Sequence, residues 1–258
     1  AGVVIALDTS YSMRHSDDSG TTRLQRAFDR VEKIAATVRP GDPVTFCLLA
    51  GDMQIVLRNA VFDPERFTAL LRSQEASVES LDLDRVPGKL ADLAAELKAP
   101  QKEVYIVTDL QETDWQQASA WRHDSFKALA ETASVFIVPV EGGAENLAIT
   151  DLDLVSGVLR KGTTARYRAT VRNFGLTPAS NVRVSGLVNT ISMDSKIIPA
   201  IAPGTSESVS LFLSFRDPGP VRITAEIDED ALLADNSRRA VAVIRDRVSV
   251  LCVEGSSE

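Results

Sequence analysis

The first half of the chain alternates short apolar runs with segments whose apolar residues recur every three or four positions. Short apolar runs bounded by small polar residues are typical of strands that are buried on both faces of a parallel sheet. The runs of this kind are residues 3–7, 104–108 and 135–140. Helical spacing is found over residues 24–38, 64–71, 87–97 and 115–132, and a hairpin is predicted to join 44–50 to 54–58. The alternation predicts an α/β fold in which helices cover both faces of an open, mostly parallel sheet.

Beyond residue 143 the strand-like segments are more regularly spaced, and turns rich in Gly and Pro separate them. The segments are residues 149–155, 165–172, 182–186, 206–215 and 221–227. Regular short strands with such turns predict an all-β sandwich. We therefore expect a first domain at residues 1–142, a β-sandwich at 147–246, and at 247–258 the opening strand of a truncated downstream domain.

The composition is that of a globular chain and argues against two classes of function. Hydrophobic residues make up 44% and charged residues 25% of the chain, which is typical of a folded, soluble protein. The net charge of −8 argues against nucleic-acid binding, because contacts with phosphates need a basic face. No stretch approaches the roughly 18 apolar residues of a membrane span, so we expect no direct membrane contact. Cys47 and Cys252 lie in apolar runs and are expected to be buried free thiols.

The segment that follows the first apolar run carries the candidate chemistry. Asp8, Ser10 and Ser12 stand at alternate positions directly after the strand predicted over residues 3–7. Such a strand delivers its last residues to the carboxyl edge of the sheet, where open α/β proteins bind their ligands. One carboxylate and two hydroxyls are hard oxygen donors, which Mg²⁺ prefers. The sequence therefore indicates a divalent-cation site at this edge.

This arrangement resembles the metal-ion-dependent adhesion site (MIDAS) of the von Willebrand factor A family, whose Asp-x-Ser-x-Ser signature is matched by Asp8, Ser10 and Ser12. Asp109, which follows a second apolar run, matches the aspartate of the family's third metal loop. The resemblance implies a Rossmann-like von Willebrand A domain with one bound Mg²⁺, Mn²⁺ or Ca²⁺. The two serines would hold the ion directly, and the two aspartates would hold it through water.

The second metal loop of the family carries a threonine that this chain lacks. Ser80 or Asp82 could supply an oxygen in its place, and Asp82 would add a permanent negative charge. If only Ser80 contributes, the ion should be held weakly, and with neither residue in place it is expected to be absent at ordinary concentrations. A weakly held or absent ion is the favoured expectation, because Leu81 falls near the threonine position and has no side-chain oxygen. In the family a vacant coordination position takes a carboxylate from a partner, so the resemblance implies a protein partner with an exposed Asp or Glu.

The turns in the second half of the chain carry distinctive short sequence motifs. They are Val-Arg-Asn-Phe-Gly at 171–175, Ile-Ala-Pro-Gly at 201–204, and Ile-Asp at 227–228 with Asp-Asn at 235–236. These motifs resemble those of the CARDB module, an immunoglobulin-like domain. A von Willebrand A domain followed by such a module is similar to bacterial membrane proteins related to the Bat aerotolerance group. The resemblance implies a non-enzymatic interaction fragment, itself soluble, of a larger protein anchored in the bacterial membrane, on a side that the sequence does not indicate.

Two other functions remain open. In the first, the chain is a metal-free structural spacer with a degenerate site, in which Asp8, Ser10 and Ser12 only cap backbone amides. In the second, Asp8 is the nucleophile of a haloacid-dehalogenase-like phosphatase. That chemistry needs a second carboxylate two residues later, where this chain has Ser10.

Overall fold

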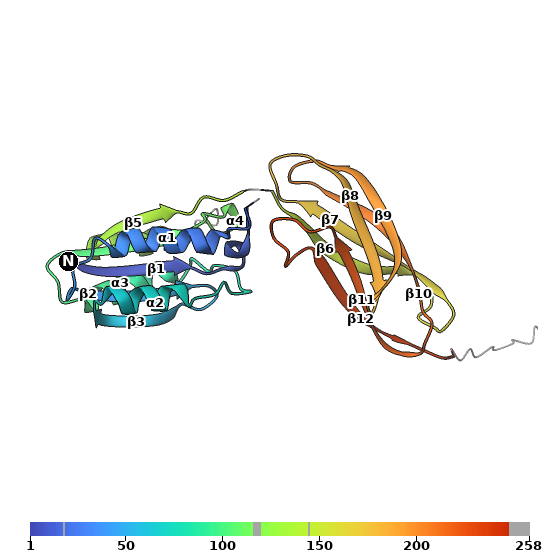
Figure 1. Cartoon of the computed structure of the whole chain (residues 1–258), viewed down its shortest axis with the longest axis horizontal. Coiled ribbons are helices and arrows are strands. Elements are labelled where there is room, and N and C mark those ends of the chain that lie inside the picture. The colour runs from blue at the N-terminus through green and yellow to red at the C-terminus, as the bar shows by residue number, and fades with distance from the viewer. Residues whose placement is uncertain (18, 116–119, 144, 248–258) are drawn as a thin grey trace, which may run out of the picture. The chain divides into compact units, whose positions relative to one another are not determined.

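The computed structural model describes residues 1–17, 19–115, 120–143 and 145–247 (Figure 1). The chain forms two compact units, Ala1–Gly143 and Ala144–Glu258, and each unit has a core of its own. Apart from residue 247, the strand expected at 247–258 lies outside the described residues, and so does Cys252. Cys47 is a buried free thiol.

The first unit is built on a five-stranded sheet with the strand order β3-β2-β1-β4-β5. Its strands are β1 (Gly2–Asp8), β2 (Pro43–Leu49), β3 (Gln54–Val61), β4 (Lys102–Thr108) and β5 (Ser134–Pro139). β1 pairs in parallel with β2 and β4, β5 pairs in parallel with β4, and β3 pairs antiparallel with β2. The central position of β1 explains its apolar composition, because every one of its residues is buried. The predicted open, mostly parallel sheet is confirmed.

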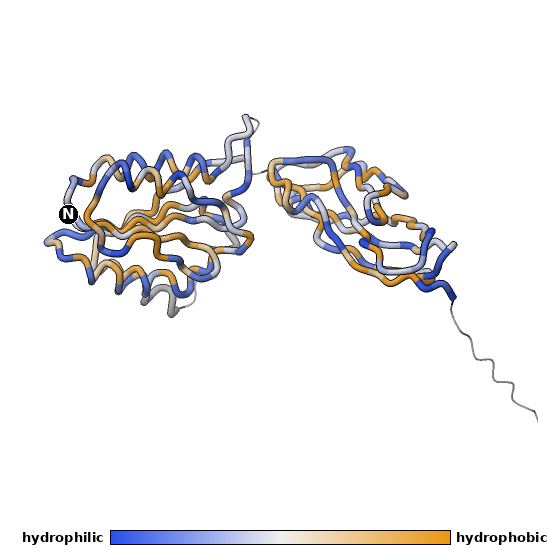
Figure 2. Tube along the Cα trace, turned by 60° about the horizontal axis from the view of Figure 1, so that its bottom comes forward, coloured by the Kyte–Doolittle hydropathy of each residue, from blue (hydrophilic) through white to orange (hydrophobic). Residues whose placement is uncertain are grey.

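Helices cover both faces of this sheet, as the apolar patterns predict. They are η1 (Tyr11–Arg14), α1 (Arg23–Ala35), α2 (Pro64–Arg72), α3 (Val86–Glu96), α4 (Glu112–Trp115) and α5 (Ala120–Thr132). On one face, Ile5 and Leu7 of β1 share a core cluster with α1 and α2; on the other, Val4 and Ala6 share one with α3 and α5. Figure 2 shows apolar strands between helices that carry hydrophilic positions on their outer sides. Within the part of the chain that the structure describes, no helix is long and apolar enough to cross a membrane.

Local signals determine where the first two long helices begin. The Thr22 side chain accepts a hydrogen bond from the backbone N–H of Gln25, and the Gln25 side chain accepts one from the backbone of Thr22. This capping box satisfies two N–H groups that have no partner within α1. Asp63 accepts two backbone N–H groups of α2, and Pro64 fills its first position, where no N–H is needed. The helix predicted over 115–132 falls on the end of α4 and on α5, with residues 116–119 outside the described residues.

The second unit is a sandwich of two antiparallel sheets. One sheet has the order β10-β7-β6, and the other has the order β12-β11-β8-β9. The strands are β6 (Leu147–Ser156), β7 (Thr164–Asn173), β8 (Ala179–Val188), β9 (Ile191–Ile201), β10 (Ser206–Ser214), β11 (Gly219–Ile227) and β12 (Ser237–Ile244). Tyr167 and Leu211 from the first sheet and Val184 and Ile223 from the second belong to one buried cluster. The predicted all-β architecture is confirmed.

Two of these strands, β9 and β12, have no counterpart among the segments predicted from the sequence. They are the two edge strands of the four-stranded sheet. In β9 only Ile198 and Ile201 are buried, and in β12 only Ile244 is buried. β9 also contains Pro199, which has no N–H to donate and is therefore tolerated at a sheet edge. β12 begins with a serine and two arginines, so neither strand shows the regular alternation of apolar and polar residues that marks β6 and β10, the edge strands of the other sheet.

The turn before β12 carries a carboxyl group whose protonation is linked to folding. Asp235 accepts a hydrogen bond from Asn146 through Oδ2 at 3.0 Å, while its Oδ1 is buried without a partner among the described residues. Burial raises the pKa of Asp235 to about 6; the bond from Asn146 opposes this rise, and the nearby charge of Asp230 adds to it. The folded state therefore binds this proton more tightly than the unfolded state does.

We predict that the contribution of Asp235 to the free energy of unfolding decreases as the pH rises from about 4 to about 6, and is constant above that range. In the Asp235→Asn variant, the free energy of unfolding should lose the part of its pH dependence that this carboxyl group contributes. Urea unfolding followed by circular dichroism at intervals between pH 4 and 7 measures the slope. Asp228→Asn, which removes an exposed carboxyl group of the same turn, is the control for the loss of one negative charge at this place. An unchanged slope in Asp235→Asn would contradict the prediction.

Candidate metal centre

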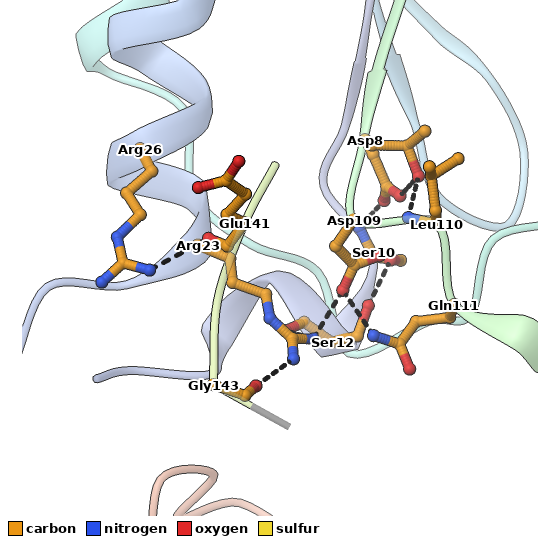
Figure 3. Close-up of polar contacts among 11 residues, drawn as sticks. Asp8, Ser10, Ser12, Arg23, Arg26, Asp109, Leu110, Gln111, Glu141 and Gly143 are labelled. Atoms are coloured by element: carbon orange, nitrogen blue, oxygen red, sulfur yellow. Dashed lines mark hydrogen bonds and ion pairs between the residues drawn. The ribbon is translucent and has the colours of Figure 1, made fainter. Parts of the chain in front are cut away.

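The carboxylate of Asp8 lies at the end of β1 and has no exposure to solvent. Its Oδ1 accepts a hydrogen bond from the backbone N–H of Ser10 at 2.8 Å (Figure 3). Its Oδ2 accepts one from the hydroxyl of Thr108 at 2.7 Å. Burial raises the pKa of Asp8 to about 6 against the effect of these hydrogen bonds, and the nearby charge of Asp109 adds to the rise. The ionised form is therefore costly in this place, and a cation close by would stabilise it.

The turn after Asp8 brings the two predicted serines together. Ser10 precedes η1 with an extended backbone, and Ser12 lies within η1. Their Oγ atoms are 3.2 Å apart. The turn is held from outside by a second loop, because the N–H of Ser77 donates to the carbonyl of Thr9 and the N–H of Tyr11 donates to the carbonyl of Glu79. Residues 77–79 therefore lie along the turn that carries the serines.

Asp109 directly follows β4, the neighbour of β1 in the sheet, and its side chain is 1% exposed. Its Oδ2 accepts hydrogen bonds from Nη1 of Arg23 at 2.7 Å and from Nε2 of Gln111 at 2.9 Å. Its Oδ1 is buried and has no partner among the described residues. One oxygen of Asp109 is thus fully engaged, while the other is free to accept.

Arg23 is the first residue of α1, and its side chain is 9% exposed. Besides the ion pair with Asp109, Nη1 donates to the carbonyl of Ser12 at 3.4 Å, and Nη2 donates to the carbonyl of Gly143 at 2.6 Å. Figure 3 shows the guanidinium group between the carboxylate and the segment 141–143. The site therefore already contains one positive charge, supplied by the chain itself.

The structure places Ser80 and Asp82 differently from the other four predicted ligands. Both residues are exposed, and Oδ1 of Asp82 accepts the backbone N–H of Asp84, two residues further along. Leu81, which lies between them, is buried in the core cluster of α3. Within the described residues, neither Ser80 nor Asp82 forms a side-chain hydrogen bond to Asp8, Ser10, Ser12 or Asp109.

The oxygen donors at this edge fit a small, hard cation. The hydroxyl groups of Ser10 and Ser12 are adjacent, Asp109 offers an unpartnered oxygen, and Asp8 adds negative charge behind them. Mg²⁺ requires few protein ligands, because it keeps several water molecules in its shell. In the described ranges no group of three or more His, Cys, Asp and Glu side chains could hold a metal ion. A cation at this site would therefore depend on the serines.

Three residues that shape the site were not identified from the sequence. Thr108 could have been found, since it ends the same strand that leads into Asp109. Gln111 lies two residues after Asp109 and carries no pattern of its own. Arg23 offered one indirect signal, because a basic residue is disfavoured in the first turn of a helix and needs a compensating partner.

Solved structures of low sequence identity align with parts of this chain. An aerotolerance-related membrane protein from Bacteroides fragilis is 19% identical with a TM-score of 0.45, over 61% of this chain and 72% of that one. Proximal thread matrix protein 1 from the mussel byssus, with a zinc-occupied MIDAS motif, is 14% identical with a TM-score of 0.43, over 53% of this chain and 37% of that one. The CARDB domain of the PF1109 protein from Pyrococcus furiosus, in complex with di-metal ions, is 15% identical with a TM-score of 0.36, over 42% of this chain and 99% of that one.

No curated protein matches the chain. The CARDB family model matches residues 144–238, which lie within the second unit. This match confirms the resemblance to CARDB that the turns of the second half predict.

Proposed function

We propose that the chain is a non-enzymatic protein-interaction fragment whose first unit binds one divalent cation, Mg²⁺ or Mn²⁺, and through it an acidic group of a partner protein. The observation that carries this proposal is the set of oxygens at the end of β1 and β4. Two serine hydroxyls lie 3.2 Å apart, and an unpartnered oxygen of Asp109 is buried at the same edge of the sheet. The domain order inferred from the sequence motifs supports a larger membrane-associated bacterial protein as the setting.

Each residue of the site has a distinct role in this proposal. Ser10, Ser12 and Asp109 would supply the oxygens that hold the cation. Asp8 orients the turn through the N–H of Ser10 and provides negative charge behind the hydroxyls. A bound divalent cation supplies positive charge and an open position, and a hard cation prefers a carboxylate oxygen there. A protein with an exposed Asp or Glu is therefore the partner that the site favours.

A metal-free spacer is the second candidate, and one observation favours it. Arg23 already neutralises Asp109, and both oxygens of Asp8 have donors within the chain. In this alternative the same contacts act as a clasp between β1, β4 and α1, and no ion takes part. Titration of the wild-type protein with Mn²⁺ separates the two candidates, because the spacer would bind none.

Because Ser80 and Asp82 do not reach the serine pair, we predict that wild-type protein binds one Mn²⁺ only weakly, at high Mn²⁺ concentration. Asp8→Asn should weaken this binding further, by at least about tenfold, the usual range for residues that orient metal ligands. Asparagine keeps an acceptor for the N–H of Ser10, so the metal-free variant should be at least as stable as wild type at pH 7. Calorimetric titration gives the affinity. Thermal unfolding with and without Mn²⁺ gives an independent measure, because a ligand of the folded state raises the midpoint. An equal Mn²⁺-induced rise in both proteins would contradict the role of Asp8.

We also predict that Ser12→Ala weakens Mn²⁺ binding, whereas Ser80→Ala and Asp82→Asn leave the affinity within about twofold of wild type. Ser12 is one of the paired hydroxyls, while Ser80 and Asp82 are exposed and lack side-chain bonds to that pair. The same calorimetric titration compares the three variants. Loss of binding in Asp82→Asn would show that this carboxylate takes the place of the family's threonine, against the geometry described above.

A further inference from the structure

The position of Arg23 is unfavourable for an arginine on two physical grounds. It is the first residue of α1, where the helix dipole is positive and repels a cation. Its side chain is also 9% exposed, and charged side chains are rarely buried unless they are paired. The ion pair with Asp109 at 2.7 Å offsets both costs. The place of Arg23 thus depends on the same carboxylate that the proposed cation needs.

The segment 141–143 closes over this arginine from the other side. Nη2 of Arg23 donates to the carbonyl of Gly143 at 2.6 Å. A Cβ atom at Gly142 would lie 2.6 Å from Nε and 2.8 Å from Cγ of Arg23, so only glycine permits this approach. Figure 3 shows the arginine reaching from α1 to both the carboxylate and the segment. The guanidinium is therefore held beside Asp109 from two sides.

We propose that Arg23 is a tethered cation that competes with a divalent cation for Asp109, so that cation binding requires the release of Arg23. This proposal rests on the proposed function of the site and adds its regulation. While Arg23 is in place, the charge of Asp109 is neutralised and a second cation nearby is repelled in a poorly solvated environment. Release of the arginine restores the negative charge of Asp109 and frees the carbonyl of Gly143.

The first test compares Arg23→Gln with Arg26→Gln in the full chain, by calorimetric titration with Mn²⁺. Arg26 lies one turn further along α1, and it donates to the carbonyl of Glu141 and pairs with Asp17. Both variants lose one positive charge from the same helix, but only Arg23 contacts Asp109. Arg23→Gln should bind Mn²⁺ at least about tenfold more tightly than wild type, which corresponds to the loss of one close charge repulsion. Arg26→Gln should stay within about twofold of wild type.

The second test displaces Arg23 without removing its charge. In Gly142→Ala the added methyl group occupies the space of the Arg23 side chain and should push the guanidinium away from Asp109. This variant should also bind Mn²⁺ more tightly than wild type. The double variant Arg23→Gln, Gly142→Ala should gain nothing beyond Arg23→Gln alone, because both changes remove the same competitor. Gly142→Ala also keeps the test decisive if Arg23→Gln does not fold.

The outcomes separate this proposal from the proposed function. Tighter binding in Arg23→Gln and in Gly142→Ala than in wild type, but not in Arg26→Gln, supports the competition. Equal affinities in wild type and all variants refute the competition and leave the cation site standing. An equal gain in Arg23→Gln and Arg26→Gln shows only a general charge effect and overturns the proposal. Absence of binding in every variant refutes the cation site together with the competition.

Discussion

The buried carboxylate of Asp8 is held by one backbone N–H and one hydroxyl, and the geometry of this edge of the first unit depends on those two bonds. β1 lies between β2 and β4 with all its residues buried, so a charge at its end has to be satisfied by the chain. The bond from Ser10 fixes the turn that pairs the two serine hydroxyls. The bond from Thr108 fixes the end of β4, which leads directly into Asp109. One charged group thus positions the oxygens that two separate strands supply.

The parts of the fold that were predicted from the sequence are those with a local physical cause. The buried strand β1 was predicted from its own apolar run, and α1 was predicted from its own periodicity. β9 and β12 were not predicted: Pro199 interrupts β9, and β12 begins with a serine and two arginines, so neither shows the alternation that marks β6 and β10, the edge strands of the other sheet. A strand is therefore predictable from the sequence where its own residues carry a regular pattern.

The residues of the site were likewise predictable only where the sequence or the sheet topology indicates that they lie close together. Asp8, Ser10 and Ser12 are close in sequence, and Asp109 follows a neighbouring strand, so their meeting could be inferred from sheet topology. Arg23 could not be placed in this way, since its partners Asp109 and Gly143 lie 86 and 120 residues further along the chain. The loop before α3 has no regular sequence pattern, so the sequence does not indicate which of its residues lie next to the serines. The structure brings residues 77–79 to that turn and leaves Ser80 and Asp82 exposed.

The hydrogen bond between Thr108 and Asp8 joins residues that are 100 positions apart, which has a consequence for the order of folding. It can close only after β1 and β4 have paired in parallel, and pairings of such long range form slowly because of their entropic cost. Before β1 and β4 pair, Ser10 and Ser12 lie on one segment and Asp109 on another, with no shared edge between them. The oxygen cluster therefore exists only in a first unit in which this long-range pairing is complete.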